Sequence, residues 1–261
     1  MDKNNIKIKF EKEDLTNIEI FNTINDLSLN NNIIKNQLAF SRSFFNKKEV
    51  QEIYKNLIQQ LYNKRIISNT VTHGSVLKIY PNDNVTNLKT ISPNIPDKLL
   101  SLEKILFEKF DILKLTRIQI VDTLQNPQDK NIMPFCLHTD KLIFFKVMIY
   151  LMDIEIENGP LHIVPVNSNG LEKMITYKNK NNFYEKHKKN WLNIPARIDS
   201  ELDTLAMEGP IGSIVLFNAH IPHKAGMLKN NKIRKVIILE YENHKQYNWR
   251  KDNNIISGKD F

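Results

Sequence analysis

The sequence predicts an α+β fold in which N-terminal helices pack against one β-rich core. Apolar residues recur every three or four positions between residues 47 and 110, and every second position between residues 117 and 242. Turn signals such as Asn158-Gly159-Pro160 separate the second set of segments. Helices followed by a run of strands are typical of an α+β arrangement. No linker rich in Pro, Gly or Ser divides the 261 residues, so we expect one domain spanning 1–261.

The N-terminal part is expected to supply two amphipathic helices. Residues 1–35 hold short apolar pieces between Asn-rich breaks, which indicates a strand and a weakly specified connection. Asn46 can cap a helix over 47–63, whose apolar stripe includes Val50, Ile53 and Leu57. Pro96-Asp97 opens a second helix, which is expected to run to about residue 110.

Six strands are expected beyond residue 115, over 117–124, around His138, and over 144–153, 161–164, 213–217 and 235–242. About forty residues, 170–210, interrupt them and include Tyr184 and Trp191. Such a long insertion predicts a lid or binding loop, and the alternative is a solvated helical excursion. Its stretch 177–190 holds five lysines against one glutamate, which suits an anionic substrate and a solvated basic loop equally well.

The composition is that of a soluble globular protein, with 41% apolar and 25% charged residues. A single cysteine, Cys136, excludes an intramolecular disulfide and favours a reducing compartment. No apolar run is long enough to span a bilayer and no signal peptide is evident, so we expect a cytoplasmic protein. The net charge of +8 fits an anionic partner or the Asn, Lys and Ile bias of an A/T-rich genome, and the scattered lysines do not favour nucleic acid.

His138-Thr139-Asp140 is the pattern most informative about chemistry. Residues i and i+2 of a strand project from one face, so His138 and Asp140 can present two ligands to one metal. His223 follows the apolar strand 213–217, and Arg234 opens the next strand. Two imidazoles and a carboxylate form a non-haem iron site, and an arginine can clamp a carboxylate. Taken alone, the pair is better explained by an ordinary His–Asp hydrogen bond, and His220 is an alternative third ligand.

Several segments together resemble the phytanoyl-CoA dioxygenase (PhyH-like) family. They are Asn158-Gly159-Pro160-Leu161 with Val164-Pro165, the strand 212–217, His223-Lys224-Ala225-Gly226, and Arg234, within a resemblance over about 38–242. The resemblance implies a double-stranded β-helix (jelly-roll, cupin-like) core over 116–245 with the lid insertion 170–210, and a strand and helix region 1–115 that packs on it. It also implies Fe(II) held by His138, Asp140 and His223, with 2-oxoglutarate and O2 as cosubstrates and Arg234 on the distal carboxylate of 2-oxoglutarate.

The sequence departs from the family pattern at three places. Val166-Asn167-Ser168 replaces the usual Gly-Ser-His after Val-Pro, Ser213 replaces an acidic residue, and Ala225 replaces a small hydroxyl residue after the third ligand. The last change removes one donor to 2-oxoglutarate, and Gln125 and Lys146 are the candidate replacements.

The resemblance implies hydroxylation of an unactivated C–H bond, with release of succinate and CO2. The substrate class is a small molecule, for example an amino acid, an acyl thioester or a natural-product intermediate. Asp140 argues against halogenation, which needs a small residue at that position. The alternatives are desaturation or cyclisation by the same cofactors, a non-catalytic jelly-roll binding protein, and an oxygenase directed at nucleic acid. The sequence does not indicate an oligomeric state.

Overall fold

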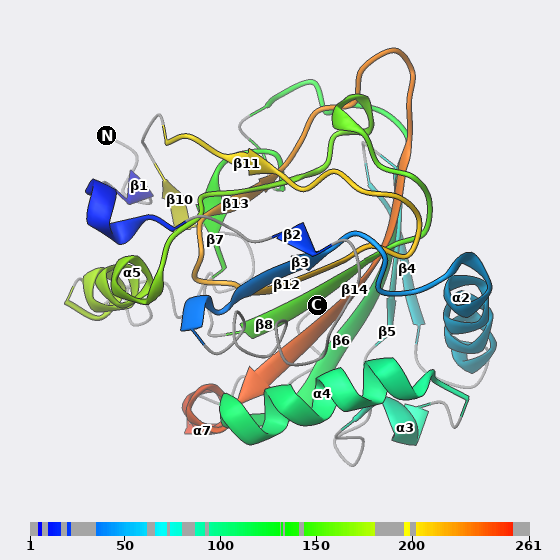
Figure 1. Cartoon of the computed structure of the whole chain (residues 1–261), viewed down its shortest axis with the longest axis horizontal. Helices are drawn as coiled ribbons and strands as arrows, with labels where there is room; N and C mark the ends of the chain where they lie inside the picture. The colour runs from blue at the N-terminus through cyan, green and yellow to red at the C-terminus, as the bar shows by residue number, and fades with distance from the viewer. Residues whose placement is uncertain are drawn as a thin grey trace.

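Two β-sheets face each other and helices cover the outside of the larger one in the computed structural model (Figure 1). The structure describes residues 5–6, 10–16, 20–21, 35–61, 66–71, 74–79, 87–91, 94–130, 132, 134–140, 144–180, 196–198 and 202–252. None of the helices in these ranges is long and apolar enough to cross a membrane.

The larger sheet has eight strands. In order across the sheet they are β2 (Ile20–Phe21), β3 (Leu38–Ser41), β12 (Ile214–Asn218), β8 (Phe144–Tyr150), β14 (Arg234–Asn243), β6 (Ile112–Thr123), β5 (Gly74–Ile79) and β4 (Ile66–Val71). All neighbouring pairs are antiparallel except β2 and β3.

The smaller sheet has six short strands. In order they are β1 (Asn5–Ile6), β10 (Ala196–Ile198), β7 (His138–Thr139), β13 (His223–Ala225), β9 (Leu161–Ile163) and β11 (Leu205–Ala206). The two sheets form the predicted double-stranded β-helix core, in which β7 and β13 lie side by side.

The helices are α2 (Lys47–Leu61), α3 (Leu88–Ile91), α4 (Asp97–Lys109), α5 (Ser168–Lys180) and α7 (His244–Asp252), with single 3-10 turns η1 (Lys12–Asp14) and η2 (Ile156–Asn158). A capping box begins α2, because Glu49 N donates to Asn46 Oδ1 and Asn46 N donates to Glu49 Oε2. Helices α2, α3 and α4 bury their apolar stripes on the outer face of the larger sheet, along which α4 runs in Figure 1.

The side chains of β14 alternate between two environments, as expected for a strand that is covered on both faces. Ile237, Leu239 and Tyr241 pack under the helices, whereas Val236 and Ile238 face the core between the sheets. The same alternation assigns Arg234 and Glu240, which are both buried, to the inner face. The space between the sheets is therefore lined by apolar residues with a charged group toward each end of β14.

The predicted helices begin where expected, at Lys47 and Asp97, and the predicted core strands are present with small shifts at their ends. The pattern did not reveal the hairpin β4–β5 or strand β3, and β6 begins five residues earlier than expected, at Ile112. The insertion opens with α5 and returns through β10, which pairs with β7. Tyr184 and Trp191, named as possible pocket residues, lie outside the described residues.

Candidate metal centre

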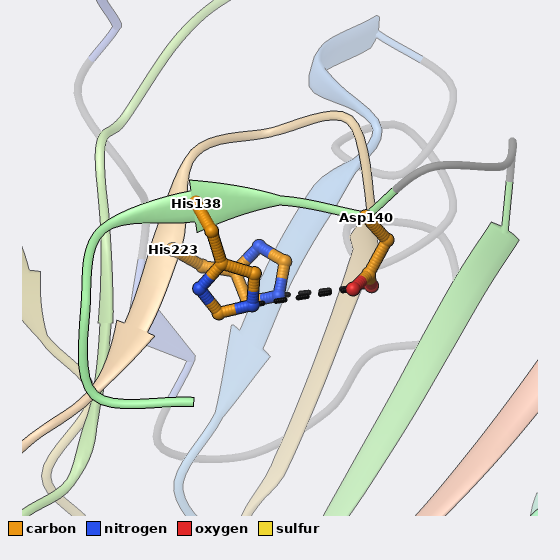
Figure 2. A group of neighbouring side chains, drawn as sticks. All are labelled: His138, Asp140 and His223. Atoms are coloured by element: carbon orange, nitrogen blue, oxygen red, sulfur yellow. Dashed lines mark ion pairs between the residues drawn. The ribbon is translucent and has the colours of Figure 1, made fainter. Parts of the chain in front are cut away.

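Two neighbouring strands bring the H-x-D pair and His223 together. Strands β7 and β13 are antiparallel, and His138 is the direct partner of His223. Asp140 follows β7, and its backbone N–H donates to the carbonyl of Ala219. The ligand atoms of the three side chains all lie within 4.8 Å of one another. Figure 2 shows both imidazole rings and the carboxylate pointing toward one common point.

Backbone carbonyls fix the orientation of both imidazoles. The Nδ1 of His138 lies 2.7 Å from the carbonyl oxygen of Cys136, and the Nδ1 of His223 lies 2.8 Å from that of Ile221. A carbonyl can only accept, so each Nδ1 carries the proton and each Nε2 offers its lone pair to the site. These Nε2 atoms lie 4.0 Å from Asp140 Oδ1 for His138 and 3.8 Å from Asp140 Oδ2 for His223.

The site fits a divalent metal. The Nε2 of His223 is buried and has no hydrogen-bond partner among the described residues. Burial lowers the pKa of His223 well below its usual value, and the neighbouring His138 lowers it further, so the ring is neutral and able to coordinate. A neutral imidazole held through its other nitrogen is the usual form of a histidine ligand. Two such imidazoles and a carboxylate match the donors of a non-haem Fe(II) centre.

Lys146 lies directly against the carboxylate of this group. Its Nζ is 2.5 Å from Asp140 Oδ2 and 3.6 Å from Glu240 Oε1. Burial alone would raise the pKa of Asp140, but the charge of Lys146, supported by both histidines, holds that pKa below its usual range. Burial would likewise lower the pKa of Lys146, and the carboxylates of Asp140 and Glu240 outweigh it, so the net shift is upward. Both groups are therefore charged at neutral pH.

Glu240 connects Lys146 to the next strand. Arg117 of β6 donates to Glu240 Oε2 from Nε at 2.6 Å and forms an ion pair with it through Nη2 at 2.5 Å. Gln119 donates to Glu240 Oε1 at 2.8 Å. The negative charge of the buried Glu240, which is only 1% exposed, is thus balanced by a two-pronged contact with Arg117. A continuous polar network joins Asp140 to β6 along the inner face of the larger sheet.

Arg234 lies at the other end of β14, six residues before Glu240. It is 6% exposed, and its guanidinium donates to the carbonyl of Gly159 and to Thr123 Oγ1, the latter at 3.2 Å. Among the described residues, no carboxylate lies within ion-pairing distance of it. Burial lowers its pKa to about 10, while the neighbouring Tyr150 opposes this shift, so it stays charged at neutral pH. A buried cation without an anionic partner is costly unless an anion binds there.

The Asn158-Gly159 turn holds Arg234 in place. Gly159 has a left-handed φ of 62°, and a Cβ at this position would lie 2.4 Å from the carbonyl oxygen of Gly226. Asn158 Nδ2 donates to the carbonyl of Ile233, the residue before Arg234. The turn that carries part of the family resemblance therefore positions the arginine as well as reversing the chain.

The remaining predicted site residues take other positions. His220 is fully buried but is not part of the group formed by His138, Asp140 and His223. Gln125 is exposed, two residues beyond the Thr123 that contacts Arg234, and its contact with 2-oxoglutarate stays a prediction. His162 is half-buried on β9, with Nδ1 3.1 Å from Thr204 Oγ1.

Sequence reasoning missed Glu240, Thr123 and the carbonyl of Gly159. Of these three, Glu240 alone is indicated by the sequence, because it is an acidic residue between the apolar residues 236–239 and Tyr241. The contacts of Thr123 and Gly159 with Arg234 depend on a strand register that no local pattern encodes.

Comparison with solved structures supports the same fold. The epimerase SnoN from nogalamycin biosynthesis is described as a non-haem, alpha-ketoglutarate-dependent enzyme. It superposes with a TM-score of 0.50 at 13% identity, over 83% of this chain and 82% of its own. The alpha-ketoglutarate-dependent carbocyclase SnoK from the same biosynthesis gives a TM-score of 0.50 at 13% identity and covers 83% of each chain. No curated protein matches the chain in sequence.

The histidine–aspartate–histidine group has the donors of a non-haem Fe(II) centre, and the fold is similar to that of these alpha-ketoglutarate-dependent enzymes. Residues 128–236 match the family model described as Phytanoyl-CoA dioxygenase (PhyH), a range that includes the triad and Arg234. The match confirms the predicted resemblance over this part of the chain and supports an oxygenase that uses Fe(II), 2-oxoglutarate and O2.

Proposed function

We propose that this oxygenase hydroxylates an unactivated C–H bond of a small molecule at an iron held by His138, Asp140 and His223. The convergence of these three ligand groups between the two sheets carries the proposal. Bound Fe(II), with O2 and 2-oxoglutarate, supplies the oxidising chemistry and yields succinate and CO2. The protein's own contribution is to bind and orient the reactants and to exclude water.

Arg234 holds the distal carboxylate of 2-oxoglutarate in this proposal. The support is its burial, its positive charge and the absence of an ion-paired carboxylate among the described residues. Thr123 and the Gly159 carbonyl fix the plane of the guanidinium, which leaves it preorganised for a planar two-oxygen anion. Preorganised contacts of this kind reduce the entropy lost on binding.

Asp140 supports hydroxylation over halogenation, because a carboxylate at this position occupies the place that a halide would need. The substrate in this proposal is an amino acid, an acyl thioester or another natural-product intermediate. The proposal retains the cytoplasmic location that the single cysteine favours. Oxygenation of nucleic acid is not part of it, because the lysines are scattered along the sequence.

Desaturation or cyclisation is the second candidate outcome. SnoK is a carbocyclase and SnoN an epimerase, so the shared fold accommodates reactions other than hydroxylation. Product analysis distinguishes them, because hydroxylation adds one oxygen atom to the substrate whereas desaturation and ring closure remove two hydrogen atoms.

Succinate formation from 2-oxoglutarate by the Fe(II)-loaded protein, measured with a panel of small molecules, tests the proposal. We expect stimulation by the correct substrate class and its loss in His138→Ala and Arg234→Ala. The matched control is His162→Ala, which removes a half-buried histidine outside the triad and should retain turnover. An iron-loaded wild-type protein that gives no succinate with any substrate, or equal turnover in His138→Ala, would contradict the proposal.

A further inference from the structure

The N-terminal segment contacts both ends of the insertion 170–210. Strand β1 runs parallel to β10, the strand through which the insertion returns to the core. The turn η1 packs against α5, the helix with which the insertion opens. Figure 1 shows β1, β10 and α5 together at the left side of the molecule. Two short pieces of the N-terminal segment are therefore placed to hold the insertion where it leaves the core and where it returns.

Asn167 joins η1 to α5 with a single side chain. Its Oδ1 accepts from the backbone N–H of Asn169 at 2.9 Å and of Gly170 at 3.1 Å, which caps the first turn of α5. Its Nδ2 donates to the carbonyls of Glu13 at 2.6 Å and Leu15 at 3.3 Å. Asn167 belongs to one of the three departures from the family pattern, and these contacts give that departure a structural role in this chain.

Further contacts fasten the same turn. Lys173 of α5 forms an ion pair with Asp14 at 2.7 Å. The backbone N–H of Asn167 donates to the carbonyl of Asp14 at 2.9 Å, and that of Thr16 donates to the carbonyl of Pro165 at 2.8 Å. The N-terminal segment is therefore tied to the start of α5 through side chains and through the backbone.

The N-terminal segment also covers apolar residues beside the metal position. Phe10 is 8% exposed and belongs to the apolar cluster between the two sheets, together with Leu171 and Met174 of α5. The same cluster includes Phe217, whose ring packs edge-on against the imidazole of His223 with 4.9 Å between the ring centroids. Closely packed apolar side chains leave little room for water. An apolar layer thus extends from the N-terminal segment to one of the proposed ligands.

Strand β10 links the N-terminal segment to the strand of another proposed ligand. It lies between β1 and β7, and its Arg197 is the direct partner of His138. The backbone N–H of Ile198 donates to the carbonyl of Leu137 at 3.0 Å. Two short strands alone are only marginally stable. The pairing of β10 with β1 therefore supports the edge along which β10 holds β7.

We propose that residues 5–6 and 10–16 form a strap that holds α5 and β10 against the core, and that release of this strap opens the route between solvent and the metal centre. The link to the metal rests on the proposed function, whereas the strap itself does not. Asn167 is the positioning residue of this device, because its side chain joins the strap to α5.

Asn167→Asp separates the two sets of contacts made by this side chain. The carboxylate keeps the acceptor that caps α5, but it places an acceptor instead of a donor against the carbonyls of Glu13 and Leu15. In the metal-free protein, hydrogen exchange at the backbone N–H groups of Thr16 and Ile198 should become about tenfold faster or more. Unchanged exchange at either group would overturn the strap.

Lys173 gives an independent test of the same contact. Lys173→Met removes a partly exposed ion pair, so exchange at the N–H of Thr16 should rise by only about twofold to fivefold. Lys173→Arg keeps a cation opposite Asp14 and should restore wild-type exchange. Equal exchange in the two variants would overturn the part of this ion pair in the strap.

Release of bound Co(II) into an excess of chelator tests the link to the metal centre. Asn167→Asp should release the ion about tenfold faster than the wild type, in proportion to its faster exchange. Ile53→Val is the control for stability, because it trims a buried side chain of the distant α2 at a similar cost in free energy. Asn46→Asp is the control for chemistry, because it makes the same change at the cap of α2. Both controls should release Co(II) at the wild-type rate.

The outcomes separate the strap from the proposed iron site. Equal release rates in Asn167→Asp and the wild type would overturn control of the metal centre by the strap and leave the iron site intact. A release as fast in Ile53→Val would overturn it too, because release would then follow global stability. Co(II) bound equally well by His138→Ala and His223→Ala would refute the proposed site, whereas the exchange results would still stand for the strap.

Discussion

Replacing Arg234 by methionine removes the only charged group of the proposed cosubstrate clamp and keeps an apolar stem of similar length. Truncating one partner of a buried, hydrogen-bonded charge pair costs about 2–5 kcal/mol. A free-energy loss of that size weakens binding by roughly thirtyfold to several-thousandfold. Because Arg234 is 6% exposed and ion-paired to no carboxylate among the described residues, we expect a value well inside this range.

The assay is an anaerobic titration of the Fe(II)-loaded protein with 2-oxoglutarate, followed by the visible charge-transfer band of the chelated iron. Thr123→Val is the matched variant, because it removes only the hydroxyl that Arg234 contacts. It should weaken binding about tenfold at most, since a neutral hydrogen bond contributes about 0.5–1.5 kcal/mol.

Pyruvate provides a second control for Arg234, because it has the chelating 2-oxo acid group but no distal carboxylate. Its affinity should be low for the wild-type protein and nearly the same for Arg234→Met. An Arg234→Met protein that binds iron normally and 2-oxoglutarate within threefold of wild type would refute the clamp. A pyruvate affinity that falls as much as that of 2-oxoglutarate would also refute it, because the loss would then not concern the distal carboxylate.

Three further results are expected. Burial raises the pKa of Glu103 from 4.5 to about 7, which favours the protonated form in the fold. The contribution of Glu103 to stability should therefore be greatest below pH 4.5 and fall by about 3 kcal/mol as pH rises to 7. Glu103→Gln should remove this slope in urea unfolding at pH 5 and pH 7.5, and an equal slope in both proteins would contradict the assignment. Gly159→Ala should lower the free energy of unfolding by more than about 1 kcal/mol, because its φ is 62° and a Cβ would strike Gly226 O; unchanged thermal unfolding would refute this. His223→Ala should abolish Co(II) binding in calorimetry while a folded His220→Ala retains it, and the reverse result would exchange their roles.

The convergence of His138, Asp140 and His223 could be predicted because each of the signals is local. An i, i+2 pair on a short strand fixes His138 and Asp140 on one face, and a histidine after a strongly apolar strand marks the return of the chain. Strand β7, which carries His138 and leads into Asp140, indeed pairs with β13 through His138 and His223. Helices α2 and α4 could also be predicted from the sequence, because capping residues and apolar stripes mark them.

The polar network behind the triad could not be predicted, because it depends on register between distant strands. Glu240 meets both Lys146 and Arg117 across β14, although both are roughly a hundred residues away in sequence. Lys146 was therefore recognised as a candidate residue, but its contact with Asp140 was not. The hairpin β4–β5 was missed because polar residues such as Ser68 and Asn69 obscure the alternation of its strands.

Anaerobic equilibrium binding of Fe(II) and 2-oxoglutarate tests the central claim most directly. We expect one iron per chain, a visible charge-transfer band when 2-oxoglutarate is added, and loss of both in Asp140→Ala and His223→Ala. Iron bound at the same stoichiometry in both variants, or a wild-type protein that shows no such band at saturating 2-oxoglutarate, would contradict the assignment of His138, Asp140 and His223 as the iron centre.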